Sequence, residues 1–225
     1  MNRQAEQFLF GDRRDAGDAL ASRLARYRSA DVLVLGLPRG GVPVAARVAR
    51  ALDAELDVLV ARKLGSPISA ELAIGAVTAD GGRFLNEDVL RELDVSETYL
   101  EAVTAVQRAE ARQREARFRG SRPAPRIAGR TVILVDDGLA TGATMRAAVQ
   151  SVRQRQPGRL VVAVPVGSRE ACEALRGEVD EVVCLHEPEY FGAVGSYYRD
   201  FEQTDDDEVR RLLDEAPALR EVEPW

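Results

Sequence analysis

The sequence is poor in the residues that carry disulfide, metal-thiolate and histidine chemistry. Its 225 residues include two cysteines, Cys172 and Cys184, and one histidine, His186. The cysteines have neither the spacing of zinc ligands nor a Cys-x-x-Cys pair, so both are predicted to be reduced packing residues. A single histidine argues against zinc chemistry and against a histidine-dependent catalytic triad, and we interpret His186 as structural.

Long apolar runs are also lacking. No stretch approaches the roughly 20 consecutive apolar residues that a membrane helix needs, and residues 1–11 lack the apolar core of a secretory signal. The net charge of -6 gives no general support for binding nucleic acid or an anionic membrane. We therefore expect a soluble cytoplasmic protein whose partners are neither nucleic acids nor membranes. The net charge does not exclude a local site for a phosphate group.

Two nucleotide-binding signatures are absent as well. No strand end carries the Gly-x-Gly-x-x-Gly dinucleotide fingerprint, and no glycine-rich loop ends in the Gly-Lys-Ser/Thr of a Walker A motif. Hydride transfer and nucleotide hydrolysis therefore lose support.

Short apolar runs alternate with amphipathic helical segments along most of the chain. The predicted strands lie at residues 32–35, 56–60, 131–135, 160–164 and 182–185. Strands that alternate with helices indicate an α/β fold with a doubly wound, mainly parallel sheet. The length suits one sizeable core, and we predict a single domain over residues 1–225 with its core at about 15–185.

The predicted core carries three additions. A helix with Asp12 or Asp15 as its cap opens the chain. Residues 61–67 are predicted to be a basic, turn-rich segment, followed by a hairpin around Asp80-Gly-Gly82. A hood and a C-terminal helix, begun by Thr204, are predicted at about 186–225.

A protruding helical insertion is predicted at about 86–120, with a break near residues 94–96. Its last part, 107–119, is almost all charged, with two pairs at supportive spacing, Glu110 to Arg114 and Glu115 to Arg119. We expect this part to project into solvent as a solvated face, and a lid over a crevice is the alternative.

Three unusual loops follow predicted strands, at residues 36–41, 62–65 and 136–144. In a doubly wound sheet ligands bind at the carboxyl ends of the strands, so these loops should face one crevice. The third leads straight into a helix, and its small residues let successive N–H groups converge on an anion. Thr141 and Thr144 add hydroxyl donors, which predicts a phosphate cradle.

An acidic pair, Asp136 and Asp137, stands immediately before this cradle. Two carboxylates can accept hydrogen bonds from vicinal hydroxyls or support a hydrated Mg²⁺, so a sugar phosphate matches both halves. An acidic pair at a strand end is also a common turn and helix-cap device, but the attached cradle disfavours that interpretation. An apolar strand, an acidic pair and then x-x-x-Thr-Gly-x-Thr resembles the phosphoribosyl pyrophosphate motif of type I phosphoribosyltransferases.

This resemblance implies roles for the residues of all three loops. Asp136 and Asp137 would contact the ribose hydroxyls and support Mg²⁺ directly, through the ligand or through water. The 5-phosphate would be held by Ala140, Thr141, Gly142, Ala143 and Thr144. The pyrophosphate would meet the Pro38-Arg-Gly-Gly41 loop, with Arg39, Gly40 and Gly41 as donors, and Lys63 with Arg62 beside it. Taken alone, the first loop is a common turn, and Arg62 with Lys63 is equally well a solvated strand end.

The stretch from 186 to 198 resembles the hood of purine-type enzymes, where an aromatic residue after a proline stacks on the base. Phe191 is the best candidate and Tyr190 the second, with core packing as the alternative for both and favoured for Tyr197 and Tyr198. The hood matches no defined purine or pyrimidine enzyme residue by residue. The acceptor base is therefore left open, as is a homodimer.

The resemblance predicts a transferase that moves phosphoribose from 5-phosphoribosyl 1-pyrophosphate to a nitrogenous base and releases pyrophosphate. Asp136, Asp137 and Lys63 would be its catalytic residues, with Mg²⁺ as cofactor. The alternative is a non-catalytic sensor of the same ligand. A sugar-phosphate hydrolase would need Asp136 exposed as a nucleophile, and we rank it third.

Overall fold

Parallel pairing of short apolar strands organises the chain. In the computed structural model, which describes residues 8–28, 30–70 and 72–216, five parallel strands form a sheet in the order β2-β1-β6-β7-β8. These strands are β1 (Val32–Gly36), β2 (Glu55–Val58), β6 (Thr131–Val135), β7 (Arg159–Val166) and β8 (Glu181–His186). The strand order reverses between β1 and β6, which confirms the predicted doubly wound α/β fold.

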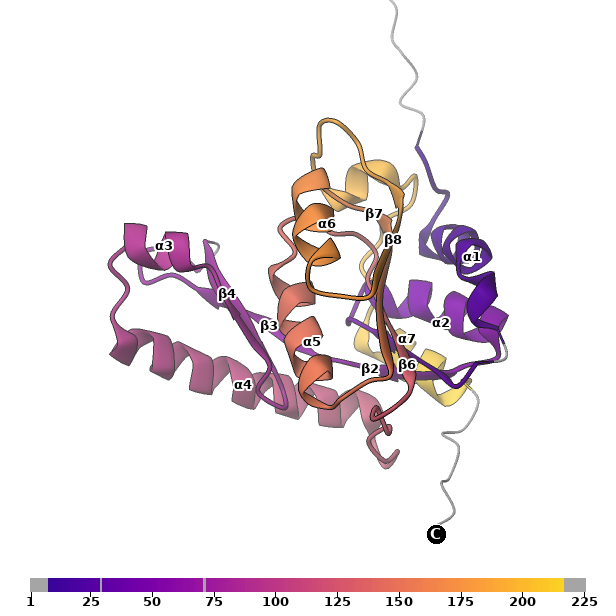
Figure 1. Cartoon of the computed structure of the whole chain (residues 1–225), viewed down its shortest axis with the longest axis horizontal. Helices are drawn as coiled ribbons and strands as arrows, with labels where there is room; N and C mark the ends of the chain where they lie inside the picture. Colours follow the sequence, from indigo (N-terminus) through magenta and orange to yellow (C-terminus); the bar gives the residue numbers. More distant parts are fainter. Residues whose placement is uncertain (1–7, 29, 71, 217–225) are drawn as a thin grey trace, which may run out of the picture.

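Helices cover both faces of this sheet (Figure 1). Neighbouring strand residues point to opposite faces, so Val34 and Ile133 join the core on one side and Leu33 and Leu134 join the core on the other. This explains why the strands are apolar at nearly every position. One face holds α1 (Arg13–Arg23), α2 (Gly41–Leu52) and α7 (Asp206–Asp214), and the other holds α5 (Ala143–Gln154) and α6 (Arg169–Arg176).

A second, antiparallel sheet extends away from the first (Figure 1). It contains β3 (Ala61–Gly65), β4 (Ala73–Thr78) and β5 (Arg83–Leu85). The hairpin between β4 and β5 was predicted correctly, and Gly81 supplies its positive φ of 106°. The prediction of a turn-rich segment at 61–67 was wrong, because most of it is β3, paired with β4.

The helical insertion consists of α3 (Glu87–Glu92) and α4 (Glu97–Arg119), with the break where it was predicted. The prediction that residues 107–119 form a solvated face holds for one side of α4, where Glu110, Arg112 and Arg117 are exposed, but the other side packs on the core. Ala111 and Phe118 are buried, and Arg119 forms an ion pair with the buried Asp57 of β2. Of the two predicted helical pairs only Glu115 with Arg119 forms, because Glu110 pairs with Arg62 across to β3.

The C-terminal helix begins one residue later than predicted. Asp205, not Thr204, is the N-cap of α7, and its side chain accepts a hydrogen bond from the Glu208 amide. Thr204 is buried instead. Residues 217–225 of the predicted hood and helix lie outside the described residues. Two short 3-10 helices, η1 (Ala25–Tyr27) and η2 (Val194–Tyr197), complete the elements.

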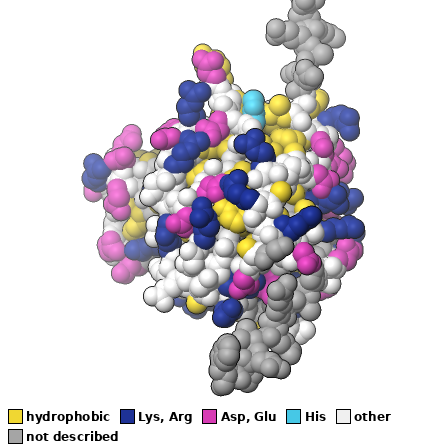
Figure 2. All heavy atoms as spheres, turned by 45° about the vertical axis from the view of Figure 1, so that its right-hand side comes forward, with side chains coloured by type: hydrophobic (Ala, Val, Ile, Leu, Met, Phe, Trp, Pro, Cys, Tyr) yellow, Lys and Arg dark blue, Asp and Glu magenta, His cyan; other side chains and the backbone are white. Residues whose placement is uncertain are grey.

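Charges of both signs are interspersed on the molecular face displayed in Figure 2, so that face offers no broad basic surface for a polyanion. Among the helices that the structure describes, none combines the length and the apolar character that crossing a bilayer requires.

The ion pair of Arg119 and Asp57 should be a main contribution of α4 to stability. The Arg119 Nε lies 3.0 Å from Asp57 Oδ2, and the Asp57 side chain is fully buried. Burial raises the pKa of Asp57, and the Arg119 charge opposes that rise. Replacing Arg119 by Met leaves the carboxylate without its cation, and we expect a loss of about 3–5 kcal/mol in the free energy of unfolding.

Urea denaturation monitored by circular dichroism measures this loss. The matched control is Arg91→Met, which removes an exposed ion pair with Asp88 and should change stability by no more than about 0.5 kcal/mol. Equal effects of the two variants would contradict the assignment of the buried pair.

Candidate functional site

The site begins where β1 and β6 end side by side. Gly36 and Val135 are paired in register, and the amide of Leu37 donates to the carbonyl oxygen of Val135 over 2.9 Å. The loops that follow these two strands therefore leave the sheet together at its carboxyl edge, which is where ligands bind in doubly wound folds.

The loop after β1 lies directly against the acidic pair. A Cβ on Gly40 would stand 2.0 Å from Asp137 Oδ2, and one on Gly41 would stand 2.8 Å from the Cα of Asp136. A side chain at Gly40 would force the Asp137 carboxylate to move, and one at Gly41 would force the backbone of Asp136 to move. The glycines of the Pro-Arg-Gly-Gly loop are thus required by a close approach that the sequence alone did not reveal.

Burial changes the proton affinity of the acidic pair. The pKa of Asp136 lies well above its ordinary value, chiefly because of burial and then because of the neighbouring Asp137 charge. The Asp137 amide donates to Asp136 Oδ1 over 2.8 Å. Burial also raises the pKa of Asp137, while the Arg13 guanidinium opposes the rise. The two adjacent carboxylates form a set of hard oxygen donors. A bound Mg²⁺ ion would offset the free-energy cost of burying their negative charges.

Arg13, from α1, is a site residue that the sequence reasoning missed. Its Nε lies 2.7 Å from Asp137 Oδ2, and both side chains are nearly buried. The same guanidinium donates to the Glu202 carbonyl over 2.6 Å and lies 3.8 Å from the centre of the Phe201 ring. Because 124 residues separate Arg13 from Asp137, no local pattern signals this contact.

Two hydrogen bonds hold the loop after β6 in place, and its Thr141 side chain is exposed. The Leu139 amide donates to the Val166 carbonyl over 2.9 Å, and the Ser168 hydroxyl donates to the Ala140 carbonyl over 2.7 Å. Gly142 adopts a positive φ of 75° as the N-cap of α5, and no side chain caps this helix. The first amides of α5 and the Thr141 hydroxyl therefore form a cradle suited to an anion.

The predicted cations do not all gather in one place. Arg39 lies 3.4 Å from Asp206, and Arg62 lies 2.6 Å from Glu110. Both line one hollow, and Arg62 also lines a second hollow of about 320 Å³ together with Lys63 and Tyr99, so Arg39 and Lys63 do not share a hollow.

Hood residues lie next to the cradle. A Cβ on Gly138 would meet Val194 at 2.4 Å, so η2 packs against the loop after β6. Phe191 is half-buried, with its ring centre 5.6 Å from that of Tyr197, whereas Tyr190 is 86% exposed. Tyr198 is buried and donates to the Asp137 carbonyl over 2.5 Å, so the packing interpretation holds for this residue.

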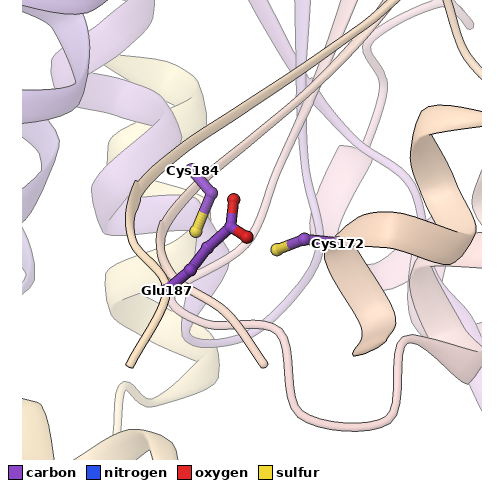
Figure 3. Close-up of side chains that lie close together, drawn as sticks. All are labelled: Cys172, Cys184 and Glu187. Atoms are coloured by element: carbon purple, nitrogen blue, oxygen red, sulfur yellow. The ribbon is translucent and has the colours of Figure 1, made fainter. Parts of the chain in front are cut away.

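The two cysteines lie together beneath the same region. Cys172 and Cys184 are free, and with Glu187 they bring three potential ligand atoms within 4.8 Å of one another (Figure 3). Glu187 is already paired with Arg176. Gly167 sits against both sulfurs, at 2.6 Å and 3.3 Å from the position of its missing Cβ. The thiols thus pack beneath the turn that supports Leu139 and Ala140.

Substituting Gly40 tests the close approach. In Gly40→Ala the added methyl collides with the Asp137 carboxylate, and we expect a loss of about 1–3 kcal/mol in stability. Gly177→Ala is the control, because its Cβ would have no neighbour closer than 3.8 Å at a φ of -81°. Chemical denaturation of both variants gives the comparison. Equal stability of the two would show that the loop does not press on the acidic pair.

Asp136 should make the stability of the free chain depend on pH. Because folding raises its pKa, the folded chain holds the proton more tightly than the unfolded chain, and ionised Asp136 destabilises the fold at neutral pH. This cost disappears as the pH falls through the raised pKa toward the ordinary value of about 4. We expect Asp136→Asn to melt at a higher temperature than the unmodified chain at pH about 8, with a gap that narrows on acidification.

Calorimetric melting curves across this pH range measure the gap. Asp88→Asn, at an 88% exposed side chain, should show no comparable gap. A lower melting temperature for Asp136→Asn at the alkaline end, or a gap independent of pH, would contradict the cost assigned to Asp136.

Comparisons with known proteins agree with this geometry. Residues 12–202 match the model of the phosphoribosyl transferase domain family. The chain is 50% identical over 208 residues to a Mycobacterium tuberculosis protein named "Putative phosphoribosyl transferase Rv0571c", and this covers 92% of the chain but 47% of the relative. The chain thus spans about half the length of the curated relatives it matches.

A solved structure extends the comparison. The crystal structure of TT1426 from Thermus thermophilus is 49% identical, with a TM-score of 0.78, and the match covers 91% of this chain and 97% of that one. The chain belongs to the phosphoribosyl transferase domain family.

Proposed function

We propose that this chain binds 5-phosphoribosyl 1-pyrophosphate with Mg²⁺ and transfers phosphoribose to a nitrogenous base, with release of pyrophosphate. The observation that carries the proposal is the meeting of three parts at the ends of β1 and β6. The glycine loop lies on the acidic pair, and the uncapped start of α5 follows that pair directly. Together these parts supply donors for two phosphate groups and acceptors for the sugar between them.

Each half of the ligand would meet its own set of groups. The hydroxyls of Thr141 and Thr144 and the amides of residues 140–144 would hold the 5-phosphate. Carboxylate oxygens of Asp136 and Asp137 would accept hydrogen bonds from the ribose hydroxyls. Arg13 would keep Asp137 ionised and oriented, because its guanidinium already binds one oxygen of that carboxylate.

The pyrophosphate would lie over the loop after β1. The Gly40 amide would donate to it, whereas the Gly41 amide, also predicted as a donor, already donates to the Leu37 carbonyl over 3.0 Å. Lys63 would add a cation, supported by its place five residues beyond the end of the neighbouring strand β2. Arg39 would join after leaving Asp206, and Arg62 after leaving Glu110. Mg²⁺, when bound, neutralises charge on the departing pyrophosphate.

The chemistry needs no nucleophilic side chain. The bond between C1 of the ribose and the pyrophosphate oxygen breaks as the acceptor nitrogen bonds to C1, and the proton of the acceptor N–H is released to the leaving pyrophosphate or to solvent. The residues of the chain would fix the ribose and stabilise charge on the leaving group. Hydrolysis through an Asp136 nucleophile is disfavoured, because Asp136 Oδ1 already accepts from the Asp137 amide and lies 2.9 Å from the position of a Cβ on Gly41, which crowds this carboxylate.

Pyrophosphate release tests the proposal. The chain is incubated with 5-phosphoribosyl 1-pyrophosphate, Mg²⁺ and one free base at a time, across purines and pyrimidines. We expect one base class to support release, and this release should disappear in Asp136→Asn/Asp137→Asn. If the chain binds 5-phosphoribosyl 1-pyrophosphate but no base leads to the release of pyrophosphate, the protein is a non-catalytic sensor and not a transferase.

Phe191 is proposed to stack on the acceptor base. Its replacement by Ala should raise the KM for the base about five- to hundredfold, the cost of a lost aromatic stack on a base. Binding of 5-phosphoribosyl 1-pyrophosphate should change little. Tyr190→Ala is the comparison, at the neighbouring and more exposed ring. Equal losses of base and phosphoribosyl ligand in Phe191→Ala would indicate that this ring only packs the hood.

A further inference from the structure

Two thiols and a carboxylate converge beneath the loop after β6. Cys172 comes from α6, Cys184 comes from β8, and Glu187 follows β8 directly. Their sulfur atoms and a carboxylate oxygen all lie within 4.8 Å of one another, and Figure 3 shows the three groups pointing toward a common point. A single ion placed between them would therefore reach all three.

The spacing of these ligand atoms is close to that of a zinc site. In tetrahedral geometry Zn²⁺ lies about 2.3 Å from each sulfur and about 2.0–2.2 Å from an oxygen, which places neighbouring ligand atoms about 3.5–3.8 Å apart. From separations of at most 4.8 Å, the side chains need to close by no more than about 1.3 Å. Thiolates select soft and borderline ions, whereas Mg²⁺ and Ca²⁺ prefer sites made of oxygen. The cluster therefore favours Zn²⁺ over the Mg²⁺ expected at the acidic pair.

The surroundings of the cluster suit a partly buried cation. Cys172 is fully buried, Cys184 is half-buried, and the Glu187 side chain is 23% exposed, which leaves a side from which an ion and a water ligand enter. Two thiolates, one carboxylate and Zn²⁺ together carry a single negative charge. Arg176, which is paired with Glu187, places one positive charge beside them and balances it.

The backbone next to the cluster supports the loop after β6. The amide of Gly167, whose missing side chain leaves room for both sulfurs, donates to the His186 carbonyl over 3.0 Å. The next amide, that of Ser168, donates to the Leu139 carbonyl over 2.8 Å. An ion bound by the cluster would thus fasten α6 to β8 at the turn on which this loop rests.

We propose that Cys172, Cys184 and Glu187 form a zinc-binding site that fastens α6 to β8 beneath the loop after β6, with a water molecule as the fourth ligand. Each thiol releases its proton to solvent as its sulfur bonds to the ion. The site uses none of the residues that the proposed function assigns to the phosphoribosyl ligand or to Mg²⁺. Zinc binding here does not depend on the proposed transfer reaction.

Titration of the full chain with Co²⁺, followed by Zn²⁺, tests the site. The chain is first stripped with a chelator and kept reduced with a phosphine. Co²⁺ bound by thiolates gives a sulfur-to-cobalt charge-transfer band, which oxygen ligands do not give. We expect this band to saturate at one Co²⁺ per chain and to disappear when Zn²⁺, the more tightly bound ion, is added.

Variants of the three ligands assign the band. Cys172→Ser and Cys184→Ser should each weaken Zn²⁺ binding at least about a hundredfold, since changes beyond the ligands alone cost about 10–100-fold. Glu187→Gln should keep a sulfur band and bind Zn²⁺ about tenfold or more weakly. Glu170→Gln, at an exposed carboxylate of α6, is the matched control and should bind as the unmodified chain does.

Two further measurements separate this site from the acidic pair. Asp136→Asn/Asp137→Asn should keep the cobalt band unchanged. Zn²⁺ should raise the melting temperature of this double variant, because it binds the folded chain, and should raise that of Cys172→Ser less. If the chain fails to bind 5-phosphoribosyl 1-pyrophosphate but keeps the cysteine-dependent band, the proposed function fails and the zinc site stands.

Two results would overturn the inference. One is the absence of the charge-transfer band when the reduced, metal-free chain is titrated with Co²⁺. The other is an equal affinity for Zn²⁺ in Glu187→Gln, Glu170→Gln and the unmodified chain. This second comparison decides the question even if the cysteine variants do not fold, because Glu187 lies at the partly exposed side of the cluster.

Discussion

The contact between a glycine loop and a pair of carboxylates is the constraint on which this site depends. Register between β1 and β6 brings two loops to one point of the sheet edge, where a Cβ on Gly40 would lie 2.0 Å from Asp137. The close approach removes water from the carboxylates and raises their proton affinity. In the free chain these two buried negative charges are unfavourable, and a bound cation and the hydroxyls of a sugar would reduce that cost.

Residues distant in sequence hold this arrangement in place. Arg13 joins α1 to Asp137, to the Glu202 carbonyl and to the Phe201 ring, so it links the start of the chain to the hood. Tyr198 completes the link with its hydrogen bond to the Asp137 backbone. The acidic pair is thus supported by residues that lie near both limits of the family match, which runs from residue 12 to residue 202.

Sequence patterns predicted the parts of this structure that local physical chemistry decides. The apolar runs indicated the parallel sheet, because a strand buried on both faces needs apolar residues at every position. The paired glycines at 81 and 82 indicated the hairpin, because a tight turn needs a positive φ. The residues from 136 to 144 were recognised because an acidic pair, a Thr-Gly turn and a helix start are contiguous.

The features that the sequence did not predict depend on contacts between residues that lie far apart in the chain. Strand β3 contains Arg62, Lys63 and Gly65, a composition typical of turns, and only pairing with β4 makes it a strand. The charged end of α4 packs on the core because its cations meet Asp57 and Asp206, far away in the sequence. The contact of Arg39 with Asp206 spans 167 residues and is equally invisible in the sequence.

The most direct measurement of the central claim is calorimetric titration of the unmodified chain with 5-phosphoribosyl 1-pyrophosphate, with Mg²⁺ and without it. We predict saturable binding that tightens when Mg²⁺ is present, since the cation would offset the negative charge of the two carboxylates and of the ligand's phosphates. No binding under either condition would contradict the assignment of the acidic pair and the cradle to this ligand.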